Sequence, residues 1–185
     1  MPRLATSTPR IAAMRLDSDD FELFGLERRQ ALDRPALDVR WRALQADVHP
    51  DRHALEGAAG QRVAMQWAMR VNEAYERLKD PLKRAAYLCE LSGAPIRAED
   101  NTAMPGAFLM RQLEWREALD AAREPAAVEA LGAEVAEERR KGLARLEALL
   151  DRDHDAAAAA QEVRALMFVE RFAHDVDRRL EALGQ

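Results

Sequence analysis

Two histidines in the first third of the chain are the residues whose types and spacing most directly suggest chemistry. His49 and His53 stand four residues apart, a spacing that can hold zinc when both lie on one continuous helix. Pro50 breaks that geometry, because its ring clashes with the preceding turn and it has no N–H to donate. We find no Gly-rich phosphate loop and no nucleophile paired with a base. The sequence therefore predicts a protein that is not an enzyme and holds neither a metal nor a cofactor.

The tripeptide His49-Pro50-Asp51 lies between two amphipathic segments. Each segment carries apolar residues at helical spacing, and a short loop from Arg52 to Gly60 separates the tripeptide from the second one. The stripes are Leu37, Trp41, Leu44 and Val48 before the tripeptide, and Val63, Trp67, Val71, Ala74 and Leu78 after it. We expect two antiparallel helices with the tripeptide exposed at the tip between them.

Start and stop signals predict two further helices around this hairpin. A first helix begins near Asp19 or Asp20 and ends by Leu26. Pro35 suits the first turn of the second helix, and the third runs from about residue 61 to 78. Asp80-Pro81 is a cap followed by a helix-starting proline, and Ser92-Gly93 ends the fourth helix.

The second half of the chain predicts a separate helical domain. Residues 94–105 show no periodicity and read as a linker, and three helical patterns follow, over 106–122, 125–152 and from 156 nearly to 183. Gly132 and Gly142 weaken the middle pattern by about 1 kcal/mol each relative to Ala. Short connections favour an antiparallel three-helix bundle over 106–185. We therefore predict an all-α protein with a four-helix domain over 19–93.

Composition limits the classes of partner. The chain has 33 acidic and 28 basic residues, a formal net charge of −5, which argues against a general nucleic-acid binder. Its one cysteine, Cys89, can build no disulfide framework and is expected to be a buried thiol. No apolar run reaches membrane-spanning length. We expect residues 1–18 to form a flexible tail and the protein to be cytoplasmic, with a mitochondrial location as the alternative, since the arginines of the tail faintly resemble a transit peptide.

The first helix of the predicted bundle has two apolar faces. Phe108, Trp115, Leu119 and Ala122 fall on one side, and Leu109, Met110 and Leu113 fall on nearly the opposite side, with Glu114 and Glu117 beside them. In the last helix, Phe168 points away from the seam of Leu166, Val169, Ala173, Val176 and Leu180. Either the N-terminal domain folds back over this second face, or the face docks a client protein.

Four blocks around the tripeptide resemble a J domain. They are Asp20–Leu26, the tripeptide itself, Asn72-Glu73-Ala74-Tyr75 with Leu78, and Asp80-Pro81 with Arg84 and Tyr87. The resemblance implies that His49, Pro50 and Asp51 contact the ATPase domain of a DnaK-type chaperone and speed its ATP hydrolysis, with Arg40, Arg42 and Arg52 assisting. J domains tend to carry a strongly basic second helix, whereas Asp38 and Asp47 offset the arginines here. The resemblance therefore implies weaker docking, or docking that depends more on Arg52.

The second half narrows the resemblance. Phe108–Asp120 and Val163–Val169 resemble the signature of HscB, the J-type co-chaperone of iron–sulfur cluster assembly, and the likeness extends from Asp20 to the end of the chain. It implies that the chaperone is HscA and that the bundle binds an IscU-type scaffold protein through Leu109, Met110, Leu113, Glu114, Glu117 and Phe168. Two alternatives stay open: a J-domain co-chaperone for an unrelated client, and a structural interaction module with an inert tripeptide.

Overall fold

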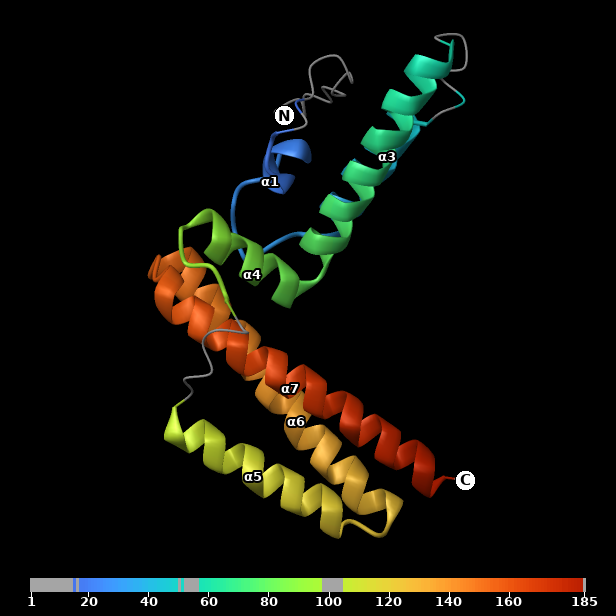
Figure 1. The fold of residues 1–185 in the computed structure, drawn as a ribbon. Helices are drawn as coiled ribbons and strands as arrows, with labels where there is room; N and C mark the ends of the chain where they lie inside the picture. The colour runs from blue at the N-terminus through green and yellow to red at the C-terminus, as the bar shows by residue number, and fades with distance from the viewer. Residues whose placement is uncertain (1–14, 16, 50, 52–56, 98–104, 185) are drawn as a thin grey trace, which may run out of the picture. The chain divides into compact units, whose positions relative to one another are not determined.

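A computed structural model of the chain describes residues 15, 17–49, 51, 57–97 and 105–184. Within these ranges the structure is helical and contains no strand. The chain divides into two compact units, Met1–Arg84 and Ala85–Gln185, and the division falls inside helix α4 (Figure 1). Most of the predicted tail and residues 98–104 of the predicted linker lie outside the described residues.

The N-terminal unit is built on an antiparallel pair of helices. It contains α1 (Asp20–Leu23), α2 (Arg34–Asp47), α3 (Gly57–Lys79) and the start of α4 (Pro81–Leu91). Side chains at the start of α2 meet the end of α3, since Arg34 donates to the Lys79 carbonyl over 3.2 Å. The third helix begins four residues before the predicted Gln61.

Aspartates cap the starts of α1, α2 and α4, and the sequence predicted the caps of α1 and α4. Asp19 accepts a hydrogen bond from the Glu22 amide at the start of α1, and Asp33 accepts one from the Ala36 amide at the start of α2. Asp80 Oδ1 accepts from two amides of α4, at 2.9 and 3.0 Å. These bonds satisfy backbone donors that have no partner within the helix. At the other end of α4, Gly93 adopts a φ of 77°, which residues with a side chain rarely adopt.

The core of the N-terminal unit follows most of the two predicted stripes, with two corrections. Trp41 is only half-buried, and its ring stacks on Tyr75 of α3 at 4.5 Å. Val63 is exposed, and Ala64 is buried in its place. Adjacent helical residues point about 100° apart, so a stripe assigned one residue out of register places the wrong side chain in the core.

Asp20 joins α1 to α3 by buried ion pairs. Its carboxylate is inaccessible to solvent and lies 2.7 Å from a guanidinium nitrogen of Arg70 and 2.7 Å from one of Arg77. A buried carboxylate is tolerated only when it is paired in this way.

The C-terminal unit contains the predicted antiparallel bundle. It consists of α5 (Gly106–Ala121), α6 (Pro125–Glu147) and α7 (Ala156–Leu183), which lie side by side in Figure 1. A π-helical turn, η3 (Ala148–Arg152), ends α6. The all-α prediction, four helices followed by a three-helix bundle, is confirmed.

Gly142 has a structural role that the sequence did not predict. A Cβ atom at this position would lie 2.5 Å from Leu166 Cδ2, so glycine leaves room for the Leu166 side chain where α6 packs against α7. The cost in helix propensity is offset by packing between the two helices.

Arg164 holds the segment after α4 against α7. It is buried and donates to the Ile96 carbonyl over 2.9 Å. Cys89 is buried in the same unit, as predicted, and desolvation raises the pKa of its thiol to about 11. No helix in the described ranges has the length and apolar composition needed to cross a membrane.

Candidate functional site

The tip of the α2–α3 hairpin is the first candidate surface. His49 and Asp51 are both exposed, and the Asp51 amide donates to His49 Nδ1 over 3.3 Å. The same ring nitrogen lies 3.7 Å from Asp51 Oδ2, an ion pair when the histidine is protonated. The imidazole therefore turns back on its own loop while the carboxylate remains open to a partner's cation. Pro50, Arg52 and His53 lie outside the described residues.

Contacts between α2 and α3 fix the helix that leads to the tip. The indole nitrogen of Trp41 donates to Asn72 Oδ1 over 3.1 Å, and the side-chain amide nitrogen of Gln45, Nε2, donates to the same oxygen. Trp41 also stacks on Tyr75, with 18° between the ring planes. Such pairs set the rotation of α2 about its axis, and with it the direction in which His49 leaves the helix.

The arginines of α2 differ in what they contact. Arg34 Nε donates to Asp38 Oδ1 over 2.7 Å, and this bond holds the pKa of the Asp38 carboxyl below its usual value. Arg40, predicted to contact the chaperone, donates to the Phe24 carbonyl over 2.6 Å and also to the Gly25 carbonyl. Its guanidinium therefore braces the connection between α1 and α2.

Arg42, the other arginine of α2 that was predicted to contact the chaperone, differs from Arg40 in its surroundings. Arg42 is exposed, and no hydrogen bond or ion pair joins it to another described residue.

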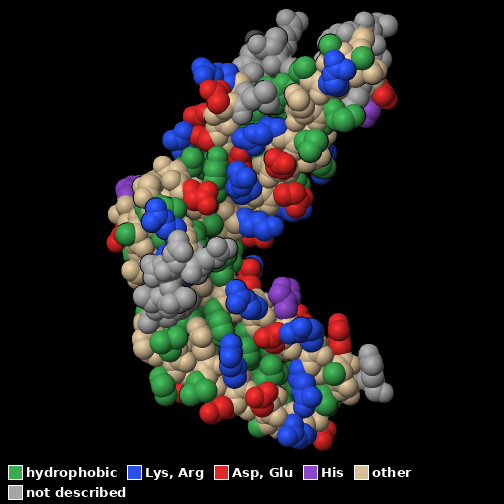
Figure 2. Space-filling model, viewed as in Figure 1, with side chains coloured by type: hydrophobic (Ala, Val, Ile, Leu, Met, Phe, Trp, Pro, Cys, Tyr) green, Lys and Arg blue, Asp and Glu red, His purple; other side chains and the backbone are tan. Residues whose placement is uncertain are grey.

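The second candidate surface is the α5 patch, made of Leu109, Met110, Leu113, Glu114 and Glu117. The three apolar side chains are 50%, 59% and 50% exposed, while Trp115 and Ala122 on the other side of α5 are buried. Figure 2 shows hydrophobic side chains gathered at the surface over the first turns of α5. As the sequence predicted, the apolar residues of the patch are not part of the bundle core.

Phe168 is less exposed than the helical wheel predicted. It is half-buried, and its ring meets the ring of Phe108 of α5 edge-on, with 5.9 Å between the ring centroids. The centroid of its ring lies 6.3 Å from that of Phe172. The wheel of α7 alone places Phe168 away from its contact with α6, but α5 packs against α7 on that side. The neighbouring Met167 is the more exposed residue.

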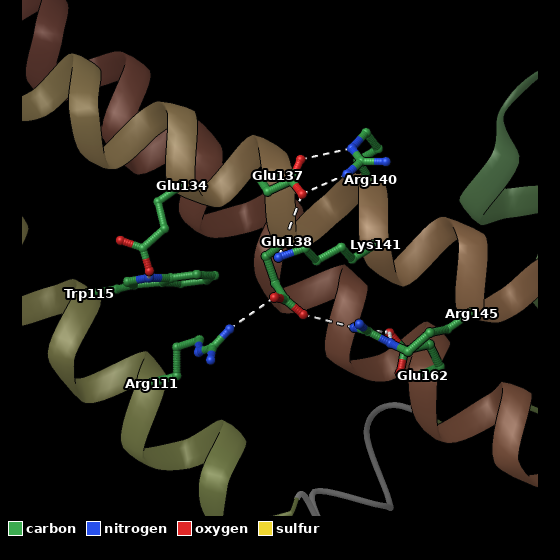
Figure 3. Close-up of polar contacts among 9 residues, drawn as sticks. All are labelled: Arg111, Trp115, Glu134, Glu137, Glu138, Arg140, Lys141, Arg145 and Glu162. Atoms are coloured by element: carbon green, nitrogen blue, oxygen red, sulfur yellow. Dashed lines mark hydrogen bonds and ion pairs between the residues drawn. The ribbon is translucent and has the colours of Figure 1, made fainter.

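A network of charged side chains braces α5 against the other two helices (Figure 3). Glu138 of α6 lies 2.9 Å from Arg111 of α5 and 2.8 Å from Arg145, which also pairs with Glu162 of α7. The Trp115 indole donates to Glu134 over 2.8 Å. These contacts hold the helix that carries the α5 patch.

Glu137 of α6 pairs within its own helix, with Arg140 at 2.6 Å and with Lys141 at 3.5 Å. The Arg140 hydrogen bond lowers the pKa of the Glu137 carboxyl. In the part of the chain that the structure describes, no group of three or more His, Cys, Asp or Glu side chains could hold a metal ion.

The chain matches proteins of one family in both sequence and structure. Residues 104–177 match the family model described as the HSCB C-terminal oligomerisation domain. The co-chaperone protein HscB homolog of Bordetella petrii is 54% identical over 159 residues, which cover 85% of this chain and 94% of that protein. The homolog of Burkholderia mallei is 52% identical over 171 residues, covering 91% of this chain and 97% of its own.

Solved structures agree with these sequence matches. The chaperone HscB from Vibrio cholerae superposes with a TM-score of 0.76 at 36% identity, over 90% of this chain and 99% of that one. Human co-chaperone protein HscB gives a TM-score of 0.83 at 24% identity, covering 89% of this chain and 83% of the human chain, a likeness of fold.

Proposed function

The chain belongs to the HscB family of co-chaperones, and from this premise we propose that it delivers an IscU-type iron–sulfur scaffold protein to HscA, a specialised DnaK-type chaperone. It binds both partners and stimulates ATP hydrolysis by the chaperone, which promotes cluster transfer and the maturation of iron–sulfur proteins. The hydrolysis takes place in the chaperone, so this chain supplies contacts and no catalytic residue.

We assign chaperone binding to a J domain over residues 19–93. The exposed Asp51 carboxylate supports this assignment, because it can form a charge-assisted hydrogen bond with a chaperone arginine. His49 orients the loop through its contact with the Asp51 amide. Pro50, Arg42 and Arg52 complete the proposed contact set, and Arg40 supports it by bracing α2.

We assign scaffold binding to the bundle over 106–185, joined to the J domain by the linker 94–105. The observation that carries the proposal is the exposure of Leu109, Met110 and Leu113 on a bundle that is packed without them. Burying a side chain of this size fully contributes about 1.5–3 kcal/mol, so covering the exposed half contributes about 1 kcal/mol each. Glu114 and Glu117 supply a polar rim suited to basic residues of the scaffold.

Tethering both partners to one chain raises the concentration of the scaffold at the peptide site of the chaperone. Coupling between the two binding events would let cluster release follow the ATP cycle. The proposed compartment is the cytoplasm, where a single unpaired thiol such as Cys89 stays reduced.

Two measurements on the full chain test the two assignments separately. Calorimetric titration with an IscU-type scaffold should show binding that Leu109→Ala/Leu113→Ala weakens about tenfold or more. Leu91→Ala, at an exposed leucine in α4, is the matched control and should change nothing. Stimulation of HscA should be lost in His49→Gln. Stimulation without scaffold binding would instead indicate a J-domain co-chaperone for an unrelated client.

A further inference from the structure

An arginine of α5 stacks on the ring of Phe168. The guanidinium carbon of Arg116 lies 5.8 Å from the centroid of that ring. Arg116 is exposed, and it forms no hydrogen bond or ion pair with another described residue. A guanidinium can stack on an aromatic face while its N–H groups, which lie in its own plane, stay free to bind a carboxylate by two hydrogen bonds. The ring therefore positions the Arg116 donors without using them.

A second exposed arginine, Arg171, lies beside the same ring. It follows Phe168 by three residues on α7, so the two side chains are neighbours on one helix face. Helical side chains lean toward the N-terminus of their helix, and this direction carries the Arg171 side chain over the turn that contains Phe168. Arg171 also forms no hydrogen bond or ion pair with another described residue.

The aspartate one turn after each arginine leaves it unpaired. Asp120 follows Arg116 by four residues without forming an ion pair with it, and Asp175, four residues after Arg171, pairs with Arg178 instead. Both guanidinium groups are therefore available to a carboxylate from another molecule.

The arginines and the carboxylates of the α5 patch border opposite edges of its apolar residues. Arg111 pairs with Glu138 of α6, so its side of α5 faces α6, whereas Arg116 faces α7 through its contact with Phe168. Each helical residue is rotated by about 100° from the last, which places Glu114 about 60° from Arg111 and about 160° from Arg116. The patch is thus acidic toward α6 and basic toward α7, and its three apolar residues lie between the two edges.

We propose that Arg116 and Arg171 bind a carboxylate side chain of the IscU-type scaffold, and that this contact fixes the orientation in which the scaffold docks. The inference rests on the function proposed above and adds a contact to the same surface. The scaffold places an acidic residue beside α7 and basic residues against Glu114 and Glu117. Charge complementarity defines this partner, because a scaffold turned end for end would bring like charges together at both edges of the patch.

Calorimetric titration of the full chain with the scaffold, at about 50 and about 300 mM KCl, tests the arginine contact. Arg171→Gln is the main variant, since it breaks no hydrogen bond or ion pair of the bundle. At the lower salt it should weaken binding about twofold to fivefold, and Arg116→Gln/Arg171→Gln about threefold to tenfold. At the higher salt both losses should shrink to less than about twofold, because salt screens exposed charges. Arg152→Gln, at an exposed arginine of η3, makes the same change in net charge as the main variant and should leave the affinity unchanged.

Double-variant cycles test the orientation. Arg171→Gln is combined in turn with replacement of each exposed acidic residue of the scaffold by its amide. One acidic position should show coupling, so that the combined loss of affinity is smaller than the product of the two separate losses. In the same cycles with Glu117→Gln, the coupled position of the scaffold should be a basic residue.

Three results would overturn the proposal. The first is unchanged affinity of both arginine variants at the lower salt, while Leu109→Ala/Leu113→Ala still weakens binding. The second is a loss that is equal at both salts, which would assign the effect to the packing of Arg116 on Phe168. The third is a dimer in sedimentation that Arg171→Gln dissociates without changing scaffold affinity, which would assign the arginines to a second copy of the chain. Absence of scaffold binding by the unaltered protein would instead refute the proposed function itself.

Discussion

Two glycines interrupt α6, and the same substitution at each should change the stability of the bundle in opposite directions. A Cβ at Gly142 would lie 2.5 Å from Cδ2 and 2.9 Å from Cγ of Leu166, which is buried in the core. A Cβ at Gly132 would lie 3.4 Å from Val176 Cγ1, an ordinary contact. Gly142→Ala must therefore displace the buried Leu166 side chain or move α6 away from α7, whereas Gly132→Ala fits.

The magnitudes follow from packing and helix propensity. Overpacking costs about 1–3 kcal/mol, and replacing a helical glycine by alanine returns about 1 kcal/mol. We expect Gly142→Ala to lower the free energy of unfolding by about 1 kcal/mol and Gly132→Ala to raise it by about 0.5–1 kcal/mol. Native-state hydrogen exchange of amides in α6 and α7 measures the change in the free energy of unfolding for the bundle alone. Equal stabilisation by both variants would refute the close approach of the two helices.

Three further predictions concern single side chains. Asp20→Asn removes the charge that pairs with two arginines, and should destabilise the N-terminal unit by about 2–3 kcal/mol in chemical denaturation, since both arginines are partly exposed. Arg34→Gln should raise the pKa of the Asp38 carboxyl toward its usual value in an NMR titration, because Arg34 holds it low. A lowered carboxyl pKa stabilises the fold above the unfolded-state pKa, so the stability difference between this variant and the unaltered protein should vanish as the pH falls through the folded-state pKa. Cys89, buried and with a raised pKa, should resist alkylation near pH 8 until the protein unfolds.

Local signals in the sequence were sufficient to predict most helix boundaries. The cap at Asp80 followed by Pro81 and the turn at Gly93 act through bonds and backbone angles within a few residues, so they can be read without a structure. The start of α3 and the exposure of Val63 could not be read in this way. The residues before α3, Ala54-Leu55-Glu56, include neither a capping side chain nor a proline, and the exposure of Val63 depends on how α3 is rotated against its neighbours.

The candidate surfaces likewise include features that one helix predicts and features that depend on contacts between helices. The exposure of Leu109, Met110 and Leu113 followed from a single helix with two apolar faces. The packing of Phe168 on Phe108 and the pairing of Glu138 with Arg111 join helices far apart in the sequence. No periodicity within one helix reports such contacts.

The most direct test of the two-partner account is the steady-state ATPase rate of HscA at a subsaturating concentration of the full chain, with and without the IscU-type scaffold. We predict that the scaffold increases the stimulation, and that Leu109→Ala/Leu113→Ala loses only this increase while the unassisted stimulation remains. An ATPase rate that does not change when the scaffold is added would contradict the account. So would a double variant whose stimulation the scaffold still increases as much as it does for the unaltered protein.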